Sequence, residues 1–326
     1  MELQSFIPQY LPAATELFLQ NFRRLRQSVP ALPATFDDEG LVAGKISRLL
    51  EAHTGVVALE EGQLVGYLTY MVLDDFRDAG KRAAYCPEWG HAAAAPFQAQ
   101  AYRRMYRAAA AQWAAQGCQV HAITLLADDQ ESLQTWFWNG FGMLVVDAVR
   151  PITPLERAPK TQLLIRQARA ADAPALAALD VEHCRYYTQS PVFMALRQSQ
   201  TADEFAEFLE QPGNSVWLAL DGDLPVGFLR LNGYEFDAAD VIASADPIFI
   251  NGAFLQPGYR SRGANSAMLK AAIQHHARLG KTCCAVDFEA FNPDAAAFWT
   301  RYFQPVCLSL MRCPETIPAN GGQIGG

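Results

Sequence analysis

The chain has 326 residues, enough for two ordinary domains, and its composition, 51% hydrophobic and 18% charged, is typical of a globular protein. A formal net charge of −8 disfavours nucleic acid as a partner, because such affinity comes mainly from basic side chains. Apolar runs of about 18 residues are absent and Met1–Tyr10 lacks the pattern of a signal peptide, so we expect a cytoplasmic protein without membrane association.

Cysteine and histidine usage gives no sign of a disulfide framework or a metal site. The seven cysteines form no Cys-x-x-Cys pair and lie in apolar stretches, so we expect buried, reduced thiols. The six histidines lack the spacing of zinc ligands, and we predict no metal.

The first half of the chain predicts an α+β plan. A hairpin is expected over Glu61–Leu68, where a Gly-containing turn separates two apolar segments. A helix then follows over Phe97–Ala115, a strand over Val120–Leu126, a helix from Asp129 and a strand over Met143–Val149.

The same order recurs about 160 residues later. Asp221–Leu229 repeats the hairpin with one inserted proline. The downstream elements are the apolar run Ile248–Leu255, a Gly-rich loop, a helix ending at Leu279, a strand over Thr282–Phe288, a helix from Asn292 and a final strand over Val306–Met311. The chain therefore predicts a duplicated α+β fold with a mixed sheet in each half.

The predicted connector between the halves is Pro151–Lys160, which combines three prolines with charged residues. We predict one domain over residues 1–157, a second over residues 158–316, and a flexible Gly-rich tail over residues 317–326.

The clearest local signal is Phe254–Ser266, which lies between an apolar strand and an amphipathic helix. Gly263 lets the backbone approach a ligand, and the free amides of a first helical turn favour an anion. Arg260 and Arg262 would add charge-assisted bonds to a phosphate, each about 1.5–3 kcal/mol. The alternative is an ordinary helix start with two solvated arginines.

This stretch resembles the acyl-CoA loop of the GNAT-type N-acetyltransferases, with Arg260 and Gly263 at matching positions and Asn265 where the family has Gly or Ala. Asn292, Ala295, Phe298 and Trp299 reproduce a second motif of that family. The resemblance covers Leu163–Cys313 and implies a GNAT-like fold with acetyl-CoA as co-substrate. The coenzyme contacts that we predict are Phe254, Leu255, Arg260, Ser261, Arg262, Gly263, Ala264, Asn265, Ser266, Asn292 and Trp299.

The first half matches the family only in part, so the chain resembles a tandem GNAT-like protein with one degenerate domain. The helix motif is matched by Asp129, Ser132, Trp136, Gly140 and Phe141. We assign the place of the phosphate loop to Pro87–Ala92, which has no arginine and adds the carboxylate of Glu88. This half is therefore not expected to hold a pyrophosphate.

The resemblance also suggests catalytic groups. Asp287 occupies the position of the base in some family members, and Glu289 shares its face of the strand. Trp299 stands where the family usually has a tyrosine acid, and an indole gives up no proton at neutral pH. Tyr302, three residues on, is the predicted substitute, although a packing role is an alternative.

Two functions remain open at this stage. The first is an N-acetyltransferase that transfers acetyl from acetyl-CoA directly to a primary amine of a small molecule or peptide, as a monomer or homodimer. The second is a non-catalytic acyl-CoA-binding or interaction module with the same fold. A dinucleotide-binding domain is disfavoured, because the loop lacks the Gly-x-Gly-x-x-Gly pattern.

Overall fold

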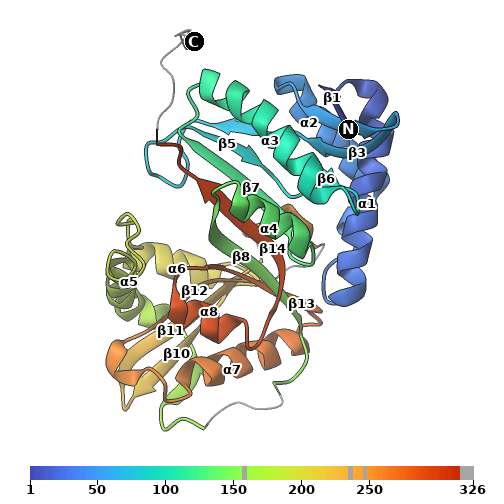
Figure 1. Cartoon of the computed structure of the whole chain (residues 1–326). Helices are drawn as coiled ribbons and strands as arrows, with labels where there is room; N and C mark the ends of the chain where they lie inside the picture. The colour runs from blue at the N-terminus through green and yellow to red at the C-terminus, as the bar shows by residue number, and fades with distance from the viewer. Residues whose placement is uncertain (156–159, 234–237, 245–247, 316–326) are drawn as a thin grey trace. The chain divides into compact units, whose positions relative to one another are not determined.

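The computed structural model describes residues 1–155, 160–233, 238–244 and 248–315, which form two compact units (Figure 1). Unit 1 comprises Met1–Asp147, Ala239–Ala243 and the described residues from Gln304 onward. Unit 2 comprises the described residues of Ala148–Ala238 and Ser244–Phe303. None of the helices in the described residues is long and apolar enough to span a bilayer.

The regular elements of unit 1 come mainly from the first half of the chain. Its helices are α1 (Leu11–Ser28), α2 (Glu39–Ala52), α3 (Gln98–Ala115) and α4 (Gln130–Trp138). Its strands are β1 (Glu2–Ser5), β2 (Val56–Glu60), β3 (Gln63–Leu68), β4 (Met71–Leu73), β5 (Ala83–Cys86), β6 (His91–Ala93), β7 (Val120–Leu126) and β14 (Gln304–Arg312). Strand β8 (Gly142–Pro151) runs across the division between the units.

The regular elements of unit 2 follow the predicted order. Its helices are α5 (Ala173–Tyr187), α6 (Ala202–Glu210), α7 (Ala264–Arg278) and α8 (Pro293–Trp299). Its strands are β9 (Leu164–Gln167), β10 (Ser215–Asp221), β11 (Leu224–Asn232), β12 (Phe249–Leu255) and β13 (Cys283–Glu289). The predicted helices and strands of both halves are confirmed to within a few residues, and the fold class is α+β with mixed sheets.

The two hairpins share one irregularity, which supports the interpretation of a duplication. In β2–β3 the register shifts by one residue at Val65, and in β10–β11 it shifts at Val226. The glycine that follows each bulge, Gly66 or Gly227, then pairs with the next strand. A Cβ at Gly227 would lie 2.6 Å from the carbonyl oxygen of Phe254, so only glycine permits this approach of β11 to β12.

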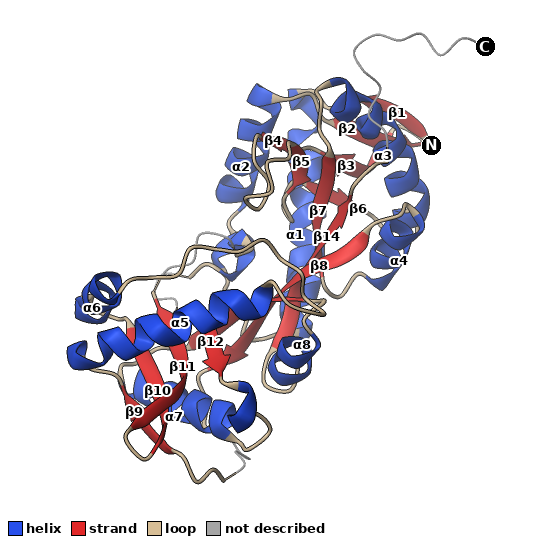
Figure 2. Ribbon diagram, turned by 90° about the vertical axis from the view of Figure 1, so that its left-hand side faces the viewer, coloured by secondary structure: helices blue, strands red, loops and turns tan. Residues whose placement is uncertain are grey.

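The sheet of unit 2 is covered by helices on both faces (Figures 1 and 2). Strands β9 to β12 are antiparallel neighbours, and β13 is parallel to β12. Alternate residues of β10 point to opposite faces, as a pleated strand requires. Val216 and Leu218 belong to the core formed with α5 and α6, whereas the Ser215 hydroxyl is hydrogen-bonded to His276 of α7.

Strands β12 and β13 separate after a short paired stretch. The described register joins Phe249 to Ala285 and Ile250 to Val286, and ends there. At this point Asn251 is an extra residue in β12, because Ile250 and Gly252 face consecutive residues of β11. Arg230 of β11 holds this bulge by donating to Asn251 Oδ1 at 3.0 Å and to its carbonyl oxygen at 2.9 Å. The two strands therefore diverge and leave an opening at their carboxyl ends.

The compact units do not coincide with the predicted domains 1–157 and 158–316. Strand β14, expected to close the second domain, pairs antiparallel with β7, from Cys307 opposite Leu126 to Arg312 opposite His121, and so belongs to unit 1. Strand exchange of this kind leaves no signal in the local pattern of either strand. The predicted boundary at 157/158 and the predicted tail, residues 317–326, lie outside the described residues.

The assignment of Pro87–Ala92 to the phosphate-loop position of the first half is wrong. Gly66 pairs with Ala93 as Gly227 pairs with Leu255, so the segment that leads into the helix is Ala94–Phe97. Strand β6 is only three residues long, too short to give a strand pattern in the sequence. The corrected segment also contains no glycine and no arginine, so the expected loss of a phosphate loop still follows.

Glu88 is a buried carboxyl group within unit 1. It accepts a hydrogen bond from the Val241 amide at 3.0 Å, and its side chain is 2% exposed. Burial, with a smaller contribution from the nearby Asp240 carboxylate, raises the pKa of Glu88 to about 7. Asp240 itself is paired with Lys45 and accepts from the indole of Trp89.

We predict that Glu88→Gln changes the pH dependence of stability. The raised folded-state pKa means that Glu88 stabilises the folded state below its unfolded pKa of about 4.5, and that this contribution is lost as pH rises through 7. A glutamine keeps the acceptor oxygen but cannot ionise. Urea unfolding should show the variant more stable than the parent by about 3 kcal/mol at pH 8.5 and by less than about 1 kcal/mol at pH 5. Equal differences at both pH values would contradict the prediction.

Candidate functional site

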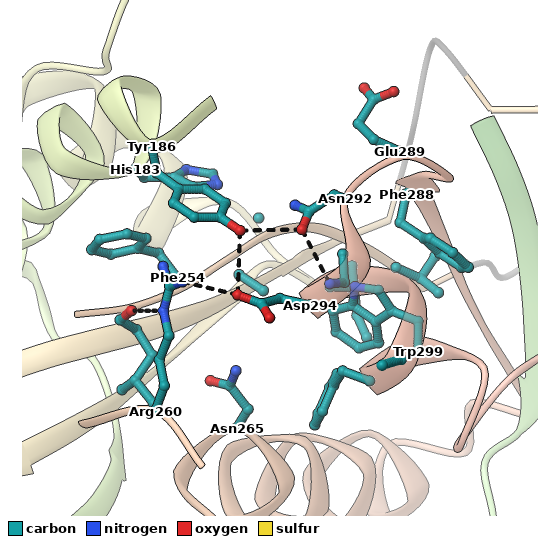
Figure 3. Close-up of a pocket in the computed structure, with 18 of the residues that line it drawn as sticks. His183, Tyr186, Phe254, Arg260, Asn265, Phe288, Glu289, Asn292, Asp294 and Trp299 are labelled. Carbon is teal, nitrogen blue, oxygen red and sulfur yellow. Dashed lines mark hydrogen bonds and ion pairs between the residues drawn. The ribbon is translucent and has the colours of Figure 1, made fainter. Parts of the chain in front are cut away.

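The opening between β12 and β13 is a cavity of about 620 Å³ within unit 2 (Figure 3). Its walls come from α5, β12, the loop before α7, the start of α7, the end of β13 and α8. All the predicted site residues line it except Arg262 and Tyr302. Those that do are Phe254, Leu255, Arg260, Ser261, Gly263, Ala264, Asn265, Ser266, Asp287, Glu289, Asn292 and Trp299.

One end of the cavity is the N-terminus of α7. Gly263 is the N-cap residue with φ of +77°, a left-handed conformation that favours glycine, and it provides no side-chain cap. The amides of Ala264, Asn265 and Ser266 therefore face the cavity end without intrahelical acceptors. Asn265 Oδ1 is buried and has no hydrogen-bond partner among the described residues. The three amides provide donors for an anion, whereas Asn265 Oδ1 is an acceptor.

Arg260 is held at the wall of this cavity (Figure 3). Its guanidinium donates to the carbonyl oxygen of Leu255 at 3.0 Å and to Asp294 Oδ2 at 3.0 Å. It also stacks on the ring of Tyr186, 4.4 Å from the centroid. The arginine thus joins the end of β12 to the first turn of α8, and an incoming anion would compete with Asp294 for it.

Asn292 caps α8, as predicted. Its Oδ1 accepts from the Ala295 amide at 3.3 Å and from the hydroxyl of Tyr186 at 3.1 Å. Because the side chain is 3% exposed and its oxygen accepts both bonds, it fixes the start of α8. Trp299 is buried at the other end of the same helix and lines the cavity.

The predicted catalytic groups are only partly brought together. Asp287 and Glu289 lie on one face at the end of β13, and both line the cavity. The hydroxyl of Tyr302 is hydrogen-bonded to Ser266 Oγ at 2.8 Å, and Tyr302 is not among the described lining residues. Its role as an acid stays a prediction.

Sequence reasoning missed the wall formed by α5 and the loop after it. His183, Tyr186, Tyr187 and Arg197 line the cavity. An Asp180 and His183 pair at spacing i, i+3 on one helix was the available signal, since such residues are neighbours on a helix surface.

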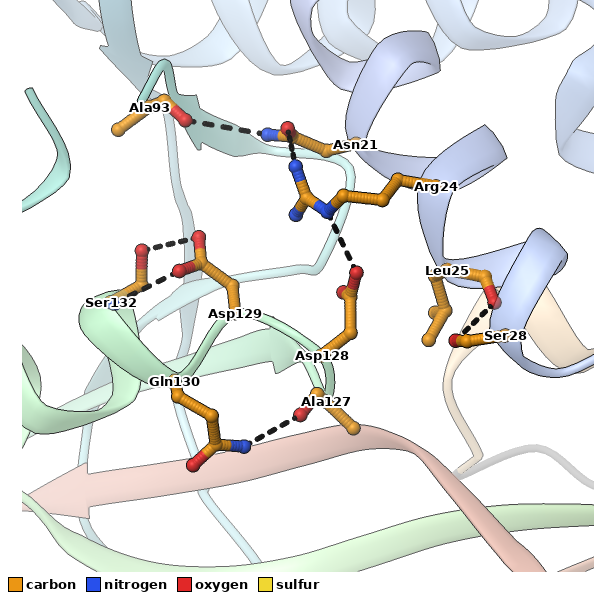
Figure 4. Close-up of polar contacts among 10 residues, drawn as sticks. All are labelled: Asn21, Arg24, Leu25, Ser28, Ala93, Ala127, Asp128, Asp129, Gln130 and Ser132. Atoms are coloured by element: carbon orange, nitrogen blue, oxygen red, sulfur yellow. Dashed lines mark hydrogen bonds and ion pairs between the residues drawn. The ribbon is translucent and has the colours of Figure 1, made fainter. Parts of the chain in front are cut away.

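The corresponding place in unit 1 is nearly closed. It holds a cavity of about 20 Å³, on the order of one water molecule. His91 is buried there with both ring nitrogens bonded, to the hydroxyl of Tyr102 and the carbonyl oxygen of Thr124. Arg24 of α1 is paired with Asp128 at 2.8 Å beside the start of α4 (Figure 4). This place has no room for a coenzyme arm.

Comparison with known proteins agrees with the geometry of unit 2. Residues 176–303 match the acetyltransferase (GNAT) family. This segment contains the α7 loop, the α8 motif and the diverging strands, so the predicted likeness to that family is confirmed over these residues. The match does not extend to the first half of the chain, where the second GNAT-like domain stays a prediction.

Solved structures show the same fold over nearly the whole chain. The GCN5-related N-acetyltransferase from Sphaerobacter thermophilus is 14% identical, with a TM-score of 0.50 and 98% of each chain covered. The glucosamine N-acetyltransferase region of a fungal multi-domain GH3 β-N-acetylglucosaminidase is 15% identical, with a TM-score of 0.52. That match covers 95% of this chain and only 38% of the fungal chain. No curated protein sequence matches the chain significantly.

We predict that Asp294→Asn strengthens the binding of acetyl-CoA. The change removes a carboxylate that competes for Arg260 and repels a diphosphate. Because Asp294 is 68% exposed, the gain should be about 0.5–1 kcal/mol, or two- to fivefold in Kd by calorimetric titration. Asp172→Asn, which breaks the Arg166 ion pair outside the lining residues, is the control and should leave Kd unchanged. Weaker binding in Asp294→Asn would show that the carboxylate supports the site.

Proposed function

We propose that unit 2 transfers the acetyl group of acetyl-CoA to a primary amine of a small molecule or peptide. The observation that carries the proposal is the cavity between β12 and β13, which has helix-terminal amides at one end and two carboxylates within the same walls. A coenzyme can place its diphosphate on the amides and run its pantetheine arm along β12, a geometry that leaves the thioester inside the cavity.

The fit of the coenzyme rests on backbone groups at the cavity that the fold leaves without hydrogen-bond partners. The α7 amides supply hydrogen-bond donors at the diphosphate end. The diverging strands leave backbone groups of β12 beyond Ile250 without a partner from β13, and these can bond the amides of a pantetheine. Direct transfer then needs no covalent enzyme intermediate.

Two carboxylates suit an amine acceptor. A primary amine is cationic near neutral pH, and Asp287 and Glu289 provide negative charge to attract it. Asp287 is the proposed base, which takes one proton from the ammonium group. The neutral nitrogen attacks the thioester carbonyl, the C–N bond forms, and the C–S bond breaks to release coenzyme A.

The proposed setting is the cytoplasm, with the chain acting as a monomer or homodimer and independently of nucleic acid and membranes. The net charge of −8 supports a cationic small molecule rather than a polyanion as partner. A non-catalytic acyl-CoA-binding module is the second candidate. The observation in its favour is the buried Trp299 at the place of the family's acid.

Calorimetric titration tests the coenzyme site. Parent protein should bind acetyl-CoA with micromolar Kd, and Gly263→Ala should weaken binding tenfold or more, because a Cβ at φ of +77° costs about 1–2 kcal/mol and approaches the ligand. Gly258→Ala is the matched control, since Gly258 lies in the same loop with open space around its Cα and outside the lining residues. No binding in the parent would overturn the proposed function.

Turnover with a panel of amines separates the enzyme from the binding module. Thiol release from acetyl-CoA is measured with glucosamine, phenethylamine, spermidine and a lysine-containing tripeptide. If an amine is acetylated, Asp287→Asn should lower kcat by about 100-fold or more while the Kd for acetyl-CoA stays within twofold. Coenzyme binding without turnover of any amine in the panel would favour the module.

A further inference from the structure

A buried histidine in α5 is unused by the chemistry described so far. His183 is 5% exposed and lines the cavity. Its ring packs against Phe254 of β12, with centroids 5.7 Å apart, and against Phe228 of β11 at 5.6 Å. It therefore lies beside the strand along which the coenzyme arm would run (Figure 3).

Asp180 orients the imidazole ring of His183 through Nδ1. The distance from His183 Nδ1 to Asp180 Oδ1 is 3.2 Å. Burial acts to raise the pKa of Asp180, but hydrogen bonds from His183 and the Gln200 amide outweigh it, so the net pKa is lowered. An ionised carboxylate can only accept, so Nδ1 carries the hydrogen. Nε2 is then left with its lone pair.

The other ring nitrogen of His183, Nε2, can accept a hydrogen bond that the fold does not supply. Nε2 is buried and has no hydrogen-bond partner among the described residues. A buried polar atom without a partner costs about 1–3 kcal/mol, so a fold seldom leaves one unless another group can bond it. A ligand group in the cavity is the natural partner for it.

The carboxylate is itself fixed by contacts that lead back to the bulge of β12. Asp180 Oδ2 accepts from the Gln200 amide at 2.8 Å, and the Gln200 side chain accepts from Arg230. Arg230 is the residue that holds the Asn251 bulge. The hydrogen bonds that join Asp180, Gln200 and Arg230 thus connect the bulge between β12 and β13 to the tautomer of His183.

We propose that His183, oriented by Asp180, is the catalytic proton carrier between the attacking nitrogen and the departing thiolate. After the neutral amine adds to the thioester carbonyl, its nitrogen bears an extra proton and a positive charge. Nε2 accepts that proton as the N–H bond breaks. The C–S bond then breaks, and Nε2 returns the proton to sulfur, which leaves as the thiol and restores neutral His183. This inference rests on the proposed acetyl transfer.

The step does not depend on the two residues considered above for the acid. Trp299 cannot donate a proton, and Tyr302, whose hydroxyl is bonded to Ser266, is not a lining residue. A histidine that is neutral before the reaction can both accept and return a proton near neutral pH.

The charged and titratable groups around His183 define its pH behaviour. They are Asp180 and Cys184 on α5, Tyr187 at its end, Arg197 in the next loop and Arg230 on β11. Burial lowers the pKa of His183, the bond to Asp180 opposes this, and the two arginines add to the lowering. The net pKa lies below the ordinary 6.5, so activity should fall on the acid side only below that value.

Two variants test the dyad in the full-length protein. His183→Gln removes the proton carrier, and Asp180→Asn offers an amide N–H to Nδ1, which moves the ring hydrogen to Nε2. Both should lower kcat by about 100-fold or more for the panel amine with the highest kcat/KM, with the KM for acetyl-CoA within threefold of the parent value. His275→Gln, a half-buried histidine of α7 outside the lining residues, is the control and should retain the parent kcat.

Two further readouts separate proton transfer from a packing role. The acid limb of the kcat profile should disappear in His183→Gln and shift to lower pH in Asp180→Asn, because the bond that raises the pKa of His183 is weakened. Nitrogen-15 NMR of the histidine rings, with His183 assigned by its absence in His183→Gln, should show Nε2 without hydrogen in the parent at pH 7. The hydrogen should move to Nε2 in Asp180→Asn.

The outcomes are distinguishable from those of the proposed function. If acetyl-CoA binds and an amine is acetylated, but both variants keep kcat and the acid limb, the dyad has no catalytic role and the acetyltransferase stands. A hydrogen on Nε2 in the parent would overturn the proposal without any acceptor being known. If the parent neither binds acetyl-CoA nor turns over, both proposals fail together.

Discussion

The separation of β12 from β13 is the constraint on which the cavity depends. Parallel pairing stops after Ile250, because the extra residue Asn251 displaces the rest of β12, and Arg230 bonds both the side chain and the carbonyl oxygen of that residue. A bulge normally costs ladder hydrogen bonds, so it persists only where neighbouring groups satisfy the freed backbone. Here the cost falls beside a cavity in which a ligand can bond the unpaired groups.

Comparison of the two units shows how the same hairpin can lead to different sites. Both carry the bulge before a glycine, yet the loop into α7 contains Gly263 in a left-handed conformation, whereas the segment into α3 has no glycine. In unit 1 the corresponding interior is filled by the buried side chains of His91, Tyr102 and Glu88. His91 is hydrogen-bonded to the Tyr102 hydroxyl, and Glu88 accepts from the Val241 amide. Unit 1 therefore has the same hairpin beside a cavity of only about 20 Å³.

Local patterns predicted much of this structure, and non-local contacts account for the rest. Short-range signals such as strand, loop and helix order predict strand β7, the helix starts at Asp129 and Asn292, and twelve of the cavity residues. The pairing of β14 with β7 and the place of Pro87–Ala92 depend on register between distant segments, which one sequence does not reveal. The α5 wall was missed because His183 gains its meaning from Phe254 and Asp180 packed around it.

The origin of β14 has a consequence for how the protein is made. Unit 1 begins at the start of the chain, but its strand β7 acquires the neighbour β14 only after all the described elements of unit 2 have been synthesised. On the ribosome, β7 must wait with one edge open while the later unit is translated, and such an edge is prone to wrong pairing. Unit 1, whose first residues are synthesised before those of unit 2, therefore receives its last strand only after the sequence of unit 2 is complete.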